Sequence, residues 1–262
     1  MSAASLPPGM RRVLVTGASS GIGRAVAEAL LARGAQVALV GRRRDRLEEI
    51  AAAAAGRTAV LVADLARPGE ADGLCARARD LLGGLDGLVC AAGVVHHQRP
   101  GAIEEGALRE QLEVNLVAPL RLGEEALSVL EPGGAVVYVA SNLAHRPIET
   151  SAVYSATKAG LLAAMRALAI AGARCDVRFN AVSPGIVDTE MVRKLRLTPG
   201  ESVPEGVAYE RRVQEQLEGL RALVPLGRLG RPEEIAAAVL HLLGAPWITG
   251  SDWIVDGGGL LG

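Results

Sequence analysis

Aromatic residues and cysteines are scarce in this chain of 262 residues. Phe, Trp and Tyr together make up 2% of it, while half of the residues are hydrophobic, so Val, Leu, Ile and Ala must build the core. The three cysteines, Cys75, Cys90 and Cys175, are widely spaced and form no CxxC pair. Their spacing excludes a disulfide framework and the usual zinc motifs, so we expect no metal and a reducing, cytoplasmic compartment.

Excess charge and long apolar runs are also missing. A net charge of −1 provides no field to hold a polyanion, so we expect neither nucleic acid nor an anionic membrane as a partner. No apolar run reaches the ~18 residues that a membrane-spanning helix needs. Residues 1–10 lack the charged and apolar regions of a signal peptide and are expected to form a flexible tail.

Short β-branched runs alternate with helical patterns along most of the chain. Near-continuous apolar strands separated by helices are typical of a parallel sheet covered on both faces. We therefore expect a single α/β domain over 1–262, with a Rossmann-like doubly wound parallel sheet of about seven strands. The expected strands are 13–15, 36–40, 60–62, 88–89, 135–139, 177–182 and 253–255, and the clearest helices cover 22–33, 45–55 and 152–171.

One segment interrupts this alternation. Residues 190–226 contain about two helices' worth of polar residues and no strand. In an open parallel sheet, an insertion after a late strand lies over the carboxyl edge, where ligands bind. We predict that this segment is a substrate lid, and an ordinary surface excursion is the alternative.

A glycine-rich stretch, TGASSGIG at 16–23, lies between the first strand and the first helix. Gly17 can take a tight turn, Gly21 lets the backbone approach a phosphate, and Gly23 allows close packing of helix and strand. The start of the helix offers free N–H groups to a pyrophosphate. The spacing is GxxxGxG instead of GxGxxG, but its position favours dinucleotide binding over a plain tight turn.

Lysine is rare, because only Lys158 and Lys194 accompany 26 arginines, and the chain has three tyrosines. Tyr154 and Lys158 nevertheless form a Tyr-x-x-x-Lys pair, which composition alone would produce about 0.02 times. Both lie on one face of the expected helix. A nearby cation favours the phenolate of a tyrosine, whose ordinary pKa is ~10. The alternative is a Tyr and a Lys that merely pack side by side.

Ser141 follows the strand 135–139 and lies thirteen positions before Tyr154. At the carboxyl edge of the sheet, its hydroxyl can donate a hydrogen bond to a substrate carbonyl oxygen. The glycine loop and the order Ser141, Tyr154, Lys158 resemble the compact, single-domain branch of the short-chain dehydrogenase/reductase family. Asn115 is similar to the fourth catalytic residue of that family, which holds a water in a proton relay through the lysine.

The resemblance covers about 12–258 and includes the motifs at 225–234 and 248–258. It implies an NADP(H)-dependent oxidoreductase that reduces a ketone to a secondary alcohol, or the reverse, with Tyr154 as general acid and base. The cofactor-binding positions that it implies are Gly17, Ser19, Ser20, Gly21, Ile22, Gly23, Arg42, Arg43, Asp64, Leu65, Ala91, Ala92, Gly93, Tyr154, Lys158, Pro184, Gly185, Ile186 and Thr189.

The end of the second strand favours NADP(H) over NAD(H). NAD-selective members usually carry an acidic residue there, whereas this chain has Gly41 followed by three arginines, Arg42 to Arg44. Guanidinium groups suit a 2′-phosphate, and a solvated arginine run is the alternative. Two positions depart from the family pattern: Ser20 replaces a basic residue found in many NADP-dependent members, and Cys90-Ala91-Ala92-Gly93 replaces Asn-Asn-Ala-Gly.

The substrate and the assembly are less closely defined. A 3-oxoacyl-thioester reductase and a reductase of small ketones, cyclic alcohols or secondary metabolites all fit the motifs, and a non-catalytic dinucleotide sensor is the alternative from another class. The chain has no C-terminal substrate domain of the extended, epimerase-like branch. The helix 159–173 is apolar on nearly all of its faces. The resemblance implies a homodimer or homotetramer with this helix at the interface. His96, His97 and His145 lie in loops that can reach the substrate.

Overall fold

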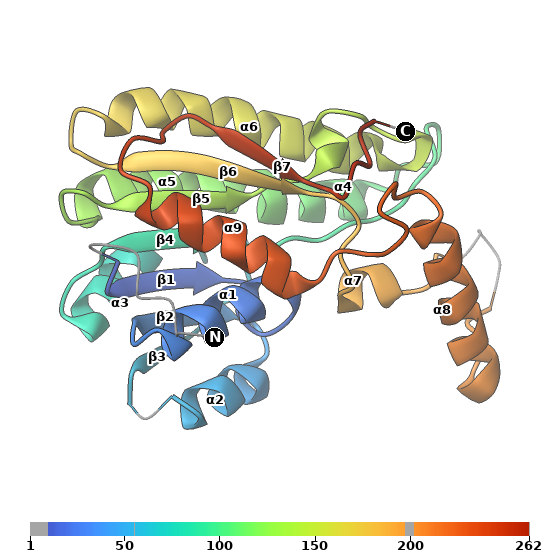
Figure 1. The fold of residues 1–262 in the computed structure, drawn as a ribbon, viewed down its shortest axis with the longest axis horizontal. Coiled ribbons are helices and arrows are strands. Elements are labelled where there is room, and N and C mark those ends of the chain that lie inside the picture. The colour runs from blue at the N-terminus through green and yellow to red at the C-terminus, as the bar shows by residue number, and fades with distance from the viewer. Residues whose placement is uncertain (1–9, 55, 197–201, 262) are drawn as a thin grey trace.

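The computed structural model describes residues 10–54, 56–196 and 202–261. Its strands form one parallel sheet in the order β3-β2-β1-β4-β5-β6-β7, so the predicted fold class is confirmed (Figure 1). Each expected strand is present and most extend one or two residues beyond the predicted limits. The strands are β1 (Arg12–Thr16), β2 (Gln36–Gly41), β3 (Thr58–Val62), β4 (Gly87–Cys90), β5 (Ala135–Val139), β6 (Arg178–Pro184) and β7 (Asp252–Val255).

Helices cover both faces of the sheet. The expected helices 22–33, 45–55 and 152–171 correspond to α1, α2 and α6. The helices are α1 (Gly21–Ala32), α2 (Arg44–Ala52), α3 (Leu74–Leu82), α4 (Glu105–Leu112), α5 (Ala118–Val129), α6 (Ala152–Gly172), α7 (Glu190–Arg193), α8 (Gly206–Arg221) and α9 (Pro232–Gly244). None of the helices in the described part of the chain has the length and apolarity needed to span a bilayer.

Two apolar cores lie on opposite faces of the sheet, because successive strand residues point to opposite sides. In β1, Leu14 packs with buried residues of α3, α5 and α6. Its neighbours Val13 and Val15 pack with α1, α2 and α9 on the other face. The same alternation in β5 turns Tyr138 toward the first core and Val137 toward the second. Aliphatic residues dominate both cores, as the scarcity of aromatics predicts.

The strand order places β1 beside β4, although β2 and β3 separate them in the sequence. The chain therefore reverses its direction of strand addition between β3 and β4. In such sheets a crevice opens at the carboxyl ends of the two central strands. The glycine loop follows β1 and the Cys90–Gly93 stretch follows β4, so both face this crevice.

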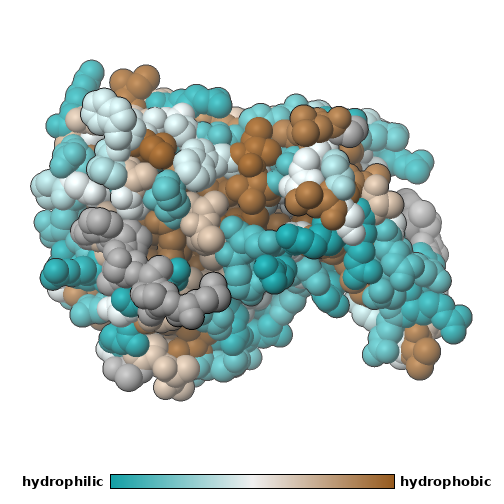
Figure 2. All heavy atoms as spheres, viewed as in Figure 1, coloured by the Kyte–Doolittle hydropathy of each residue, from teal (hydrophilic) through white to brown (hydrophobic). Residues whose placement is uncertain are grey.

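The described residues of the segment 190–226 include helices and no strand, as predicted. The segment contains α7 and α8, while 197–201 lie outside the described residues, as do 1–9 of the predicted tail. Figure 1 shows that α8 extends away from the sheet and lies farther from it than α7 does. Figure 2 shows that α8 is mostly hydrophilic, whereas apolar side chains gather over β7 and the adjoining part of α6.

Candidate functional site

The glycine loop after β1 can exist only without side chains at two of its positions. Gly17 has a φ of +67°, and a Cβ there would lie 2.8 Å from the Ala92 backbone. A Cβ on Gly23 would lie 2.4 Å from the carbonyl oxygen of Gly17. These contacts place the start of α1 directly against the loop that follows β4. The free N–H groups of α1 thus face the crevice, as a pyrophosphate site requires.

A cavity of about 480 Å³ lies over this loop. It contains most of the cofactor positions predicted from the sequence, together with several residues that were not predicted. The predicted residues that line it are Gly17, Ser19, Ser20, Gly21, Ile22, Arg42, Arg43, Asp64, Leu65, Ala91, Ala92, Gly93 and Thr189. The additional lining residues are Gly41, Ala63, Ala66, Val94, Val95, His96, Glu110, Val114, Glu190, Met191 and Lys194.

Arg43 is held across the glycine loop. Its Nη2 donates to the hydroxyls of Ser20 (2.6 Å) and Ser19 (3.1 Å), and its Nη1 donates to Glu190 (2.8 Å). Ser20 stands at the position where many NADP-dependent members of the family have a basic residue. The Arg43 side chain brings a guanidinium to that position from the end of β2. The missing positive charge is therefore supplied by another element.

The loop after β4 is held from two sides. The Thr16 hydroxyl accepts hydrogen bonds from the main-chain N–H groups of Ala91 (3.1 Å) and Ala92 (3.2 Å). Asn115 accepts from the N–H of Val94 at 2.9 Å and donates to its carbonyl at 2.8 Å. These bonds fix the backbone although two side-chain amides of the family pattern are absent.

Asn115 lies between two α-helices. It sits in a π-helical turn, η1 (Glu113–Val117), between α4 and α5, and its side chain is fully buried. The bulge turns the side chain inward, toward Val94 and the Thr157 hydroxyl (3.4 Å). Turns of this kind often mark functional sites. No feature of the hydrophobic period predicts such a turn.

Ser141, Tyr154 and Lys158 come together at the carboxyl edge of the sheet. Ser141 ends the connection from β5 and accepts a hydrogen bond from the N–H of Leu143 (3.1 Å), so its own O–H stays available as a donor. The Lys158 ammonium donates to the Val139 carbonyl (2.9 Å) and lies 5.8 Å from the centre of the Tyr154 ring. A Cβ on Gly93 would be 3.7 Å from the Lys158 nitrogen, so this group adjoins the cavity.

Burial sets the protonation of both titratable groups. It raises the pKa of Tyr154 above its ordinary value of 10, and a hydrogen bond with Ser141 opposes the rise. Burial lowers the pKa of Lys158 to about 8, and the nearby Cys90 opposes that change. The sequence predicted that Lys158 would favour the phenolate. In the structure the ammonium donates to the Val139 carbonyl, and burial is the largest influence on the pKa of Tyr154.

The turn after β6 leads to the cavity, which it reaches at Thr189. Gly185 packs so tightly that a Cβ would lie 2.7 Å from Asp256, and its N–H donates to Val255 (3.0 Å). Thr189 comes next to the glycine loop, where a Cβ on Gly21 would lie 3.2 Å from its methyl group. The predicted cofactor positions that do not line the cavity are Gly23, Tyr154, Lys158, Pro184, Gly185 and Ile186.

The three loop histidines differ in their surroundings. His96 lines the cavity, and its ring lies 2.6 Å from the Glu110 carboxylate. Burial lowers the pKa of His97 to about 4, with further contributions from Arg196 and His96. His145 pairs with Asp252 (2.7 Å). His96, one of the loop histidines that we expected to be able to reach the substrate, therefore lines the dinucleotide cavity.

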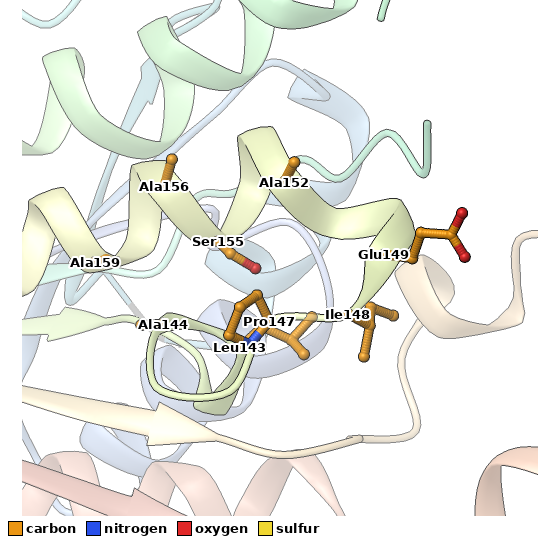
Figure 3. Close-up of a pocket in the computed structure, with 9 residues that line it drawn as sticks. All are labelled: Leu143, Ala144, Pro147, Ile148, Glu149, Ala152, Ser155, Ala156 and Ala159. Carbon is orange, nitrogen blue, oxygen red and sulfur yellow. The ribbon is translucent and has the colours of Figure 1, made fainter. Parts of the chain in front are cut away.

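A second hollow, of about 530 Å³, lies between the Ser141–Ile148 stretch and α6 (Figure 3). Its lining is mostly apolar, and it shares no residue with the dinucleotide cavity. Figure 3 shows Ser155 pointing toward Pro147 and Leu143, while the Glu149 carboxylate points away. The lining residues are Leu143, Ala144, Pro147, Ile148, Glu149, Ala152, Ser155, Ala156 and Ala159.

Comparisons with known proteins match nearly the whole chain. A family model described as "Enoyl-(Acyl carrier protein) reductase" matches residues 17–259. Carbonyl reductase family member 4 from Xenopus tropicalis is 32% identical over 246 residues, which cover 93% of this chain and 95% of that protein. The 3-oxoacyl-[acyl-carrier-protein] reductase from Homo sapiens is 32% identical over 249 residues, with coverage of 93% and 95%.

Solved structures agree with these matches. A short-chain dehydrogenase/reductase from Brucella melitensis, described as a glucose/ribitol dehydrogenase, has a TM-score of 0.83 and 31% identity and covers 97% of this chain and 98% of its own. A short-chain dehydrogenase from Burkholderia cenocepacia J2315, in complex with NADP, has a TM-score of 0.82 and 28% identity, with coverage of 98% and 100%.

Proposed function

Because this chain belongs to the short-chain dehydrogenase/reductase family of oxidoreductases, whose members use nicotinamide dinucleotides, we propose that it is an NADP(H)-dependent carbonyl reductase. It reduces a ketone to a secondary alcohol, or catalyses the reverse, with Tyr154 as general acid and base. The observation that carries this proposal is the grouping of Ser141, Tyr154 and Lys158 beside a cavity that the glycine loop lines.

The cavity suits a dinucleotide, because the glycine loop lines it and packs so closely on the Ala92 backbone that Gly17 cannot carry a Cβ. The pyrophosphate would lie on the N–H groups at the start of α1, with Ser19, Ser20 and Ile22 beside it. Asp64 and Leu65 would contact the adenine, and Ala91 to Gly93 would flank the adenosine. Tyr154 and Lys158 would hold the nicotinamide ribose, while Pro184 to Ile186 and Thr189 would hold the carboxamide.

Two features support NADP(H) over NAD(H). β2 ends in Gly41, so no carboxylate is there to bind the ribose 2′-hydroxyl and repel a phosphate. Arg43 brings a guanidinium to the cavity wall, fixed by Ser19 and Ser20, and Arg42 also lines the cavity. A guanidinium held in place loses little further freedom when it binds a phosphate.

The protein's own residues perform the proton chemistry. When bound, the reduced nicotinamide supplies the hydride to the carbonyl carbon. The Ser141 hydroxyl and the Tyr154 phenol donate hydrogen bonds to the carbonyl oxygen and stabilise the charge that develops on it. Tyr154 then gives its proton to that oxygen. Lys158 then returns a proton, drawn from solvent, to Tyr154, and Asn115 would hold a water molecule in this relay, since both side chains adjoin Gly93.

The test is consumption of NADPH with a panel of ketones that includes a 3-oxoacyl thioester. Tyr154→Phe should lower kcat/KM at least about 1000-fold, since it removes the proton donor, and should leave NADPH binding largely intact. Tyr138→Phe is the matched control, because its buried hydroxyl has no hydrogen-bond partner among the described residues. Loss of turnover and of NADPH binding together would mean that Tyr154 is structural. Tight NADPH binding without turnover of any ketone would favour a dinucleotide sensor.

A 3-oxoacyl thioester is the specific substrate that we would test first, because it is the substrate class named for the human relative. The segment 190–226 is the proposed substrate lid: α7 lines the cavity through Glu190 and Met191, Lys194 lines it just after α7, and α8 follows. Chimaeras that exchange residues 202–226 with those of a relative of known substrate, and so keep Glu190, should change KM for ketones and leave the NADPH affinity unchanged.

We also propose a homodimer or homotetramer. Leu161 and Met165 of α6 are buried in the core, but Ala163 and Ile170 on its outer face are exposed. The second hollow continues this face. Ile254 of the edge strand β7 is also exposed, and Figure 2 shows apolar side chains gathered over β7 and the adjoining part of α6. Exposed apolar surface of this kind suits a subunit interface. A monomer in sedimentation would contradict this.

A further inference from the structure

Glu190 occupies the place where the proposed function puts the 2′-phosphate. We propose that Glu190 is a specificity-determining residue of the dinucleotide site. Its carboxylate competes with the 2′-phosphate of NADP(H) for Arg43 and so reduces the preference for NADP(H) over NAD(H). This inference rests on the proposed function, in which Arg43 binds that phosphate.

Two guanidinium groups hold the Glu190 carboxylate. Its Oε2 accepts a hydrogen bond from Nη1 of Arg43 at 2.8 Å, and its Oε1 accepts one from Nη1 of Arg46. A carboxylate bound by two arginines has the charge and the acceptor geometry of a phosphate edge. The pair of arginines therefore forms an anion site that an internal anion already fills.

The remaining donors of Arg43 are directed into the glycine loop. Its Nη2 contacts the hydroxyls of Ser20 and Ser19, at 2.6 and 3.1 Å. The guanidinium thus lies between the loop and Glu190, and only its Glu190 side can accept a new anion without breaking the bonds to the loop. A phosphate that binds Arg43 from the cavity must displace Glu190 or lie beside its negative charge.

The location of Glu190 makes this competition direct. Glu190 is the first residue of α7, and it lines the same cavity as Ser19, Ser20, Arg42 and Arg43. Hydrogen bonds from Arg43, and then from Arg46, lower the pKa of its carboxyl below the ordinary value of 4.5. The carboxylate is therefore ionised at neutral pH. It supplies from α7 the negative charge that NAD-selective members carry at the end of β2.

The test compares Glu190→Gln with wild type by calorimetric titration of the full-length chain with NADPH and NADH. Glutamine keeps the size and one acceptor oxygen of the side chain, and it removes the charge and the second acceptor. We expect the Kd for NADPH to fall about three- to tenfold and the Kd for NADH to change less than about twofold. Adenosine 2′,5′-bisphosphate and 5′-AMP should show the same contrast, because they carry only the adenosine end.

Two control variants isolate the contact. Glu48→Gln removes the same charge from an ion pair with Arg44 on α2 that does not line the cavity, and it should leave the ratio of the two Kd values unchanged. In an Arg43→Gln background, Glu190→Gln should no longer tighten NADPH binding, since the shared partner is gone. High salt should reduce the difference in NADPH Kd between the wild type and Glu190→Gln, because both ion pairs of Glu190 are partly exposed.

The outcomes separate the two proposals. If Glu190→Gln leaves the NADPH-to-NADH ratio unchanged or lowers the preference for NADPH, the inference about Glu190 is wrong. The NADP(H) proposal still holds in that case, provided that Arg43→Gln weakens NADPH binding. If Arg43→Gln has no effect on NADPH, or if the wild type binds neither nucleotide, the proposed function itself fails.

Discussion

Lys158 is a buried cation, and its burial should make the fold more stable at alkaline pH. Its side chain is almost completely buried, and its only hydrogen-bond partner in the described residues is the Val139 carbonyl. Burial lowers its pKa from 10.5 to about 8. Below pH 8 Lys158 carries its proton in both the folded and the unfolded chain. The full free energy of burying the charge then destabilises the folded state. Between pH 8 and about 10.5 only the unfolded chain binds the proton, so stability rises with pH in that window.

The size of the effect follows from the same two values. The difference between 10.5 and about 8 corresponds to about 3 kcal/mol of unfavourable burial at pH 7. By pH 9.5 about 2 kcal/mol of this cost is relieved. For a chain of this length, that change corresponds to about 4–8 °C in Tm. Lys158→Met lacks the titrating group, so the Tm of the wild type minus that of the variant should increase by this amount between pH 7 and pH 9.5.

Thermal unfolding at a series of pH values, in low and constant ionic strength, measures this difference. The pH dependence of this Tm difference does not contain the other titrating groups, because they are the same in both proteins. It does not contain the cost of the Val139 carbonyl left unpaired in the variant either, because that cost does not change with pH. The chain offers one matched control, because Lys194 is its only other lysine and is exposed. Lys194→Met should show no such trend. A difference for Lys158→Met that stays constant within about 1 °C would refute the argument from burial.

Two further substitutions test the frame that carries the site. Asp86→Asn should lower the free energy of unfolding by about 2–3 kcal/mol in chemical denaturation. The buried carboxylate accepts hydrogen bonds from two main-chain N–H groups and from the Arg12 guanidinium. A loss below ~0.5 kcal/mol would contradict this. Gly23→Ala should weaken NADPH binding at least about tenfold in titration, because its Cβ would meet the Gly17 carbonyl at 2.4 Å. Gly219→Ala, in the open surface of α8, should leave binding unchanged, and equal effects of the two alanines would exclude the steric explanation.

The sheet could be predicted because its information is local. Each strand is a short apolar run, and the alternation with helices specifies a parallel arrangement before any contact is known. Ser141 and Tyr154 could be located for the same reason, since one ends a strand and the other begins a helix. The π-helical turn at Asn115 could not, because one extra residue in a turn leaves the sequence pattern of α4 and α5 unchanged.

The protonation state of Tyr154 was also beyond the sequence. Spacing alone brings Tyr154 and Lys158 to one helix face, but it does not give the direction in which the ammonium points. In the structure that direction is decided by the Val139 carbonyl of a neighbouring strand. Burial then dominates the pKa of Tyr154.

Arg43 and Ser20 show how far a family pattern can be applied to single positions. The pattern marks Ser20 as a missing positive charge, so it predicts that Ser20→Arg would strengthen NADPH binding. The structure predicts a change below about threefold, because Arg43 already donates to the Ser20 hydroxyl at 2.6 Å and a second guanidinium would repel it. In an Arg43→Gln background, however, Ser20→Arg should restore much of the lost NADPH affinity, since the charge returns to the same place. If Ser20→Arg strengthens binding more than about tenfold in the wild type and fails to rescue Arg43→Gln, then Arg43 does not supply that charge.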